Sequence, residues 1–76
     1  MNINTYRLTN RQVQVLECLT EGLSNKEISE KLKIAEGTVK VHVSAVYQAL
    51  RVESRTAAVR AASHYGLIGI VQSVFP

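Results

Sequence analysis

The side chains most suited to binding chemistry are basic and polar residues within the stretch 34–51. Lys40, Ser44 and Gln48 recur at intervals of four, so on a helix they share one face, and Val41 lies beside them. A lysine can donate to guanine or to a phosphate, a hydroxyl can donate and accept, and a valine can contact a thymine methyl group. The same face is also compatible with simple solvated surface, because single exposed valines and lysines are common.

Catalytic and metal-binding chemistry finds no support in the sequence. No His, Cys, Asp and Glu group has metal-ligand spacing, and no Ser, His and Asp order indicates a nucleophilic mechanism. We therefore predict neither an enzyme nor a cofactor. Cys18 is the single cysteine, which excludes an intramolecular disulfide and suits a reducing cytosol.

The length and charge of the chain limit its class. Its 76 residues support one domain, with a core over about 8–67, a lead-in at 1–7 and a tail at 68–76. A hydrophobic content of 46% is too high for disorder, and the net charge of +3 permits an anionic partner without proving one. The longest apolar run, 66–71, is too short to span a bilayer, so we predict a soluble, cytoplasmic protein without a membrane partner.

The central stretch 34–51 is predicted to be a helix. Val39, Val43, Val46 and Leu50 fall on one helical face. Alternation of valines at the start of this stretch favours a strand, but the helical period continues past Ser44 without a turn signal. Val41 then points away from the core.

Two earlier helices carry matching start signals. Thr9 with Gln12 and Ser24 with Glu27 each have the spacing of a capping box, and each box is flanked by a pair of apolar residues. Gly22 is predicted to end the first helix as its C′ residue. The second helix is short and ends near 31–33.

The third and fourth helices begin differently. Ala35 has no side-chain oxygen to cap the third helix, whereas Ser54 is a good N-cap for the fourth. The fourth helix is rich in alanine and ends at Gly66. Its predicted inward face is Ala58, Val59 and Ala62, and its predicted second face is Ala57, Ala61 and His64.

These elements predict an all-α fold, a four-helix bundle that contains a helix-turn-helix. In that arrangement the second helix of the pair lies in the major groove of DNA. Lys26 in the first turn of the second helix and Lys40 near the start of the third suit such a role.

Specific motifs also carry a resemblance to a known family. The motifs are Leu8-Thr9-x-Arg11, Val15-Leu16, Gly22-Leu23-Ser24-Asn25-Lys26-Glu27-Ile28, Thr38-Val39-Lys40-x-His42 and Leu50-x-Val52-x-x-Arg55. In order and spacing they resemble the LuxR-type (response-regulator-type) DNA-binding domain, over about 8–67. The resemblance implies a bacterial transcription regulator that binds a two-half-site operator in double-stranded DNA as a homodimer, with RNA polymerase as a further partner.

The resemblance also implies residue roles. Base contacts fall on Lys40, Val41 and Ser44. Backbone contacts fall on Asn25, Lys26, Thr38, His42 and Arg55, and the dimer contact on the fourth helix, at Ala57, Ala61 and His64. For His42 a packed, hydrogen-bonded residue is an equally good interpretation. Ala35 and Ala49 replace polar residues usual in the family, which predicts a weaker affinity for DNA.

A protein-interaction module is the competing interpretation. A small helical bundle can dock a partner through its alanine-rich fourth helix and apolar tail. Such a module would show no salt-steep binding to DNA, whereas a DNA-binding domain would.

Overall fold

The computed structural model describes residues 8–64. Four helices follow one another: α1 (Asn10–Thr20), α2 (Asn25–Leu32), α3 (Glu36–Leu50) and α4 (Arg55–His64). The described residues contain no strand, so the predicted all-α class is confirmed. No helix in the range 8–64 is long and apolar enough to cross a membrane. The expected lead-in, the tail and the expected helix end at Gly66 lie outside the described residues.

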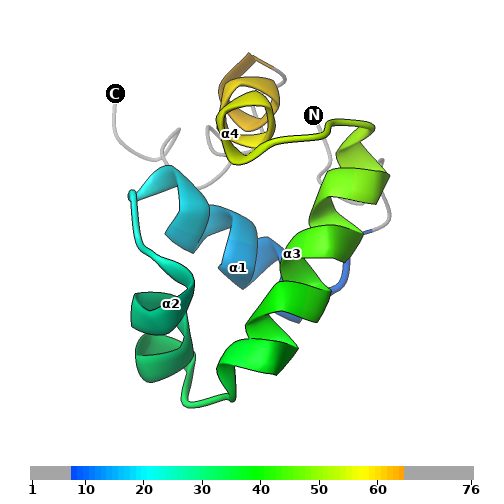
Figure 1. Ribbon diagram of the computed structural model, residues 1–76. Helices are drawn as coiled ribbons and strands as arrows, with labels where there is room; N and C mark the ends of the chain where they lie inside the picture. The colour runs from blue at the N-terminus through cyan, green and yellow to red at the C-terminus, as the bar shows by residue number, and fades with distance from the viewer. Residues whose placement is uncertain (1–7, 65–76) are drawn as a thin grey trace.

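Helix α3 packs against the three other helices, and α1 also packs against α4. Figure 1 shows α2 and α3 on either side of the lower part of the molecule, with α1 between them and α4 above. The short connection between α2 and α3 makes these two helices the helix-turn-helix pair.

The core follows the predicted helical faces. Val39, Val43, Val46 and Leu50 are all buried along one side of α3. The remaining buried residues are Leu8, Val15, Leu16, Cys18, Leu19, Ile28, Ala58 and Ala62. Burial raises the pKa of the Cys18 thiol, as expected for a small packed residue rather than a reactive thiol.

Capping boxes close the starts of α1 and α2, as predicted. In α2 the Ser24 amide donates to Glu27 Oε1 at 2.8 Å, and the Glu27 amide donates to Ser24 Oγ at 3.1 Å. In α1 Thr9 and Gln12 make the equivalent bonds at 3.0 and 3.1 Å. Ser54 Oγ accepts from the Ala57 amide at 3.1 Å at the start of α4. Ala35 makes no side-chain cap to α3.

Left-handed residues follow the first three helices. Gly22 after α1 was predicted, and its φ is 84°. Lys33 after α2 and Arg51 after α3 each have a φ of 58°, which the sequence did not predict because neither is glycine. After Arg51 the Val52 amide donates to the Tyr47 carbonyl at 2.9 Å, the long hydrogen bond of a Schellman motif.

Candidate nucleic-acid interface

The outward face of α3 carries the three residues predicted to contact bases. Lys40, Val41 and Ser44 are all exposed, and Gln48 continues the same face. Val41 is 66% exposed and is the exposed large hydrophobic residue among the described ones. Contact with a partner would remove this apolar side chain from water, which is favourable. The three predicted base-contacting residues therefore offer one cation, one hydroxyl and one apolar side chain.

Helix α2 contributes a second set of candidates in its first turn. Lys26 is exposed and Asn25 is half-buried, directly after the Ser24 cap. The hydrogen bonds to Ser24 lower the pKa of Glu27, and the nearby charge of Arg55 lowers it further. Glu27 is thus held as a carboxylate that serves the cap.

The start of α3 carries the remaining predicted backbone contacts. Thr38 is exposed in its first turn. His42 is half-buried, between the buried Val43 and the exposed Val41. This placement is compatible both with packing and with a contact to a phosphate.

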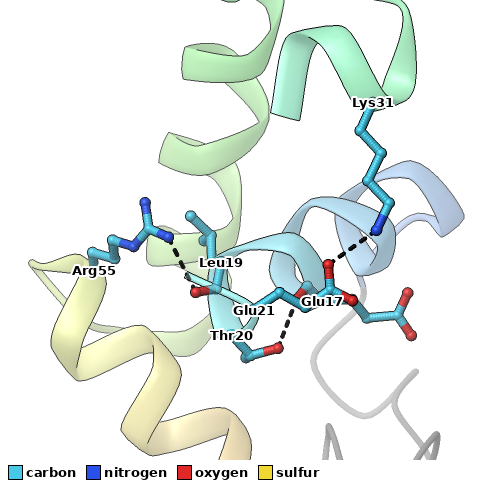
Figure 2. Close-up of polar contacts among 6 residues, drawn as sticks. All are labelled: Glu17, Leu19, Thr20, Glu21, Lys31 and Arg55. Carbon is cyan, nitrogen blue, oxygen red and sulfur yellow. Dashed lines mark hydrogen bonds and ion pairs between the residues drawn. The ribbon is translucent and has the colours of Figure 1, made fainter. Parts of the chain in front are cut away.

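The described residues contain one ion pair, between Lys31 and Glu21. Lys26 and Lys40 take part in no ion pair among the described residues. Lys31 Nζ lies 2.9 Å from Glu21 Oε1, and both side chains are 53% exposed. Figure 2 shows this pair linking α2 to the residue that ends α1. The hydrogen bond and charge of Glu21 raise the pKa of Lys31. A pair this exposed contributes little to stability.

Arg55 makes a contact that sequence reasoning missed. Its Nη2 donates to the carbonyl oxygen of Leu19 at 3.2 Å, across 36 residues of chain (Figure 2). The side chain is half-buried, so part of its donor capacity serves the fold. The sequence signal was limited to the match with a family motif, because no local pattern links positions so far apart.

Alanines near the predicted DNA-binding and dimer surfaces are less exposed than the sequence suggested. Ala49 is partly buried and packs against the core, so only part of its side chain is available near the proposed DNA side. On α4, Ala57 and Ala61 are both half-buried, and Ala61 packs against the core as well. His64 is the last described residue of α4. The predicted dimer face therefore offers only part of its alanine surface to a partner.

A metal site is not formed by the described part of the chain, where no group of three His, Cys, Asp or Glu residues comes together. One exposed lysine, a hydroxyl and an apolar side chain on the outward face of α3 are instead suited to nucleic acid.

Comparison with known proteins agrees with this geometry. The family model described as "Bacterial regulatory proteins, luxR family" matches residues 6–62, most of the chain. The chain belongs to the LuxR family. The resemblance seen in the sequence is thereby confirmed.

Individual LuxR-family relatives are similar over the same region. The transcriptional regulatory protein LnrK of Bacillus subtilis (strain 168) is 52% identical over 60 residues, which cover 79% of this chain and 27% of LnrK. The nitrate/nitrite response regulator NarP of Escherichia coli (strain K12) is 51% identical over 51 residues, or 67% of this chain and 24% of NarP. The crystal structure of the response regulator ChrA of a heme-sensing two-component system aligns with a TM-score of 0.76 at 43% identity, over 79% of this chain and 30% of ChrA.

The chain thus corresponds to the helix-turn-helix domain of LuxR-family transcriptional regulators and not to an enzyme. It spans about a quarter to a third of the length of these relatives.

Proposed function

We propose that this domain binds double-stranded DNA sequence-specifically, with α3 in the major groove and two copies on a two-half-site operator. The observation that carries the proposal is the outward face of α3, where Lys40, Val41 and Ser44 are exposed together. The major groove of B-DNA is about 12 Å wide and admits an α-helix. RNA polymerase is the further partner that a transcription regulator would engage.

The base contacts divide by chemistry. The Lys40 ammonium donates to guanine O6 and N7, and the Val41 side chain contacts a thymine methyl group. Ser44, one turn after Lys40, donates or accepts and therefore tolerates several bases. Val41 gains most from burial, since it is 66% exposed in the free domain.

The backbone contacts position α3 in the groove. Asn25 and Lys26 lie at the start of α2, which in a helix-turn-helix crosses the sugar-phosphate backbone. Thr38 precedes the base-reading residues in the chain, and His42 lies between Val41 and Ser44. Both are assigned to contacts with phosphates. Such contacts fix register without reading sequence.

The dimer contact is proposed on α4, through Ala57, Ala61 and His64. Small side chains let two helices approach closely across a two-fold axis. Because Ala57 and Ala61 are half-buried within one copy, little apolar area remains for the dimer. DNA would therefore supply much of the pairing energy.

The direct test selects duplexes of about 30 base pairs from a randomised library, long enough for two half-sites one helical turn apart. Affinities for a selected and a scrambled duplex are then measured by fluorescence anisotropy across a salt series. We expect a preference for the selected duplex and a slope of log affinity against log salt of about −0.9 per phosphate contacted. Equal, salt-insensitive binding to both would contradict the proposal and favour the interaction module.

A charge change on α3 makes this test residue-specific. Val41→Glu places a carboxylate on the proposed reading face, so we expect binding to the selected duplex to be abolished while thermal stability is retained. Gln14→Glu is the matched control, because Gln14 is exposed on α1 and the charge change is identical. Equal losses for both variants would mean that net charge, and not the α3 face, governs binding.

A further inference from the structure

Helix α4 is held to the domain by unusually small side chains. Its fully buried residues are Ala58 and Ala62, with Val59 only partly buried against the core, whereas α1, α2 and α3 fully bury leucine, isoleucine or valine. Helices set their crossing angle by the interlocking of side-chain ridges with grooves. The methyl groups of Ala58 and Ala62 form low ridges, so a further contact would help to fix the angle and register of α4.

Arg55 supplies a directional contact at the start of this helix. The bond from its Nη2 to the Leu19 carbonyl is 3.2 Å long and partly buried. Within residues 8–64 it is the side-chain hydrogen bond that joins α4 to another helix, since the Ser54 bond stays within the cap of α4. Figure 2 shows the guanidinium directed at the end of α1.

The charge at both ends of this contact favours it. The last carbonyl groups of a helix carry a partial negative charge and lack intrahelical partners. The Leu19 carbonyl lies in that last turn and also accepts from the Gly22 amide at 3.1 Å. A cationic donor there completes its hydrogen bonding and opposes the helix dipole.

The surroundings of Arg55 are open rather than close-packed. A groove of about 440 Å³ lies between the end of α1 and the start of α4, and its lining includes Leu19, Gly22, Arg55, Val59 and Arg60. The groove leaves the end of α1 and the start of α4 less closely packed where Arg55 bridges them. Without the guanidinium, the start of α4 loses this directional link to α1.

We propose that Arg55 is a positioning residue that fixes the orientation of α4 relative to the helix-turn-helix. If two copies pair through α4 on DNA, as the proposed function holds, this bond also sets the half-site spacing that the dimer accepts. The family resemblance implies a phosphate contact for Arg55, and the two roles predict different results.

The first test needs no DNA. Backbone residual dipolar couplings of the 76-residue chain report the orientation of α4 relative to the other helices. In Arg55→Ala, we expect the couplings measured for α4 to disagree with the alignment tensor fitted to α1–α3. Arg60 is an exposed arginine that lines the same groove, and in Arg60→Ala we expect the α4 couplings to agree with that tensor. Arg55→Lys keeps a charged donor and should deviate less than Arg55→Ala. If Arg55→Ala fails to fold, Arg55→Lys is compared with the wild-type chain, and we expect a smaller but measurable change in the orientation of α4. An unchanged orientation of α4 in the variants that lack Arg55 would overturn the proposal.

The second test uses the selected duplex and one with its half-sites moved apart by one base pair. We expect Arg55→Ala to reduce discrimination between the two spacings by about fivefold or more, with the salt slope unchanged. A slope that falls by about one unit per copy, with spacing discrimination intact, would make Arg55 a phosphate contact and overturn the positioning role. Failure of the wild-type chain to bind DNA would count against the proposed function alone, because the couplings test Arg55 independently.

Discussion

Helices α2 and α3 form one motif but are stabilised in different ways. Both follow a half-buried apolar residue, Leu23 or Ile34, and both are followed by a left-handed residue. The start of α2 is closed by the Ser24–Glu27 capping box, whereas Ala35 provides no cap for α3. The helix without a cap, α3, is the one that buries more residues.

The buried side chains of α3 compensate for the missing side-chain cap at its N-terminus. Four residues of α3 are buried, but only Ile28 is buried in α2. The anchored α3 can therefore present Val41 to solvent, while α2 depends on its cap, on the buried Ile28 and on the partly buried Leu32. The helix proposed to read DNA is therefore held in place by its buried face and not by a cap at its N-terminus.

The largest expected effect comes from Ile28, the one fully buried side chain of α2. Ile28→Ala should destabilise the domain by about 2–5 kcal/mol, because it removes a fully buried side chain and leaves a cavity. Leu50→Ala removes as many carbon atoms from α3, but Leu50 is 8% exposed and shares its helix with three other buried residues. We therefore expect a smaller loss from Leu50→Ala in urea unfolding. A larger loss from Leu50→Ala would refute the contrast in anchoring.

A smaller effect is expected from exchanging the caps. Ser24→Ala should cost about 0.5–2 kcal/mol, and Ala35→Ser should gain a similar amount, because each changes one side-chain acceptor for the first-turn amides. Urea midpoints of the two variants and of the double variant measure this directly. If Ala35→Ser leaves the urea midpoint unchanged, another group already accepts hydrogen bonds from the first-turn amides of α3.

The smallest expected effect is the acid dependence of the α2 cap. The pKa of Glu27 is lowered from 4.5 in the folded domain, chiefly by its hydrogen bonds to Ser24. Its contribution to stability is therefore present above pH 4.5 and is lost as pH falls through the lower, folded value. We expect Glu27→Gln to lack this part of the acid destabilisation. Parallel urea titrations at decreasing pH test it, and identical pH profiles for the two proteins would contradict it.

Local features of the fold were predictable from the sequence. The two capping boxes, the Gly22 helix end and the buried face of α3 depend on residues close in the chain, so their spacing revealed them. The exposure of Lys40, Val41 and Ser44 followed from the same helical period.

Features that depend on distant contacts were not predictable. The Arg55–Leu19 bond joins residues 36 apart, and no local pattern encodes it. The packing of Ala49 and Ala61 against the core depends on where neighbouring helices lie. The left-handed residues Lys33 and Arg51 were missed because the sequence signal for that conformation is glycine.

The most direct test of the central claim compares Lys26, in the capped α2, with Lys40, on the outward face of α3. Affinities of Lys26→Ala and Lys40→Ala for the selected and scrambled duplexes are measured across a salt series. We predict that Lys26→Ala weakens both complexes alike and reduces the salt slope by about one unit for each phosphate that the variant no longer binds. Lys40→Ala should cost about 1–3 kcal/mol on the selected duplex and less on the scrambled one. Equal losses on both duplexes for Lys40→Ala would contradict base reading by this residue and leave specificity to Val41, Ser44 and DNA shape.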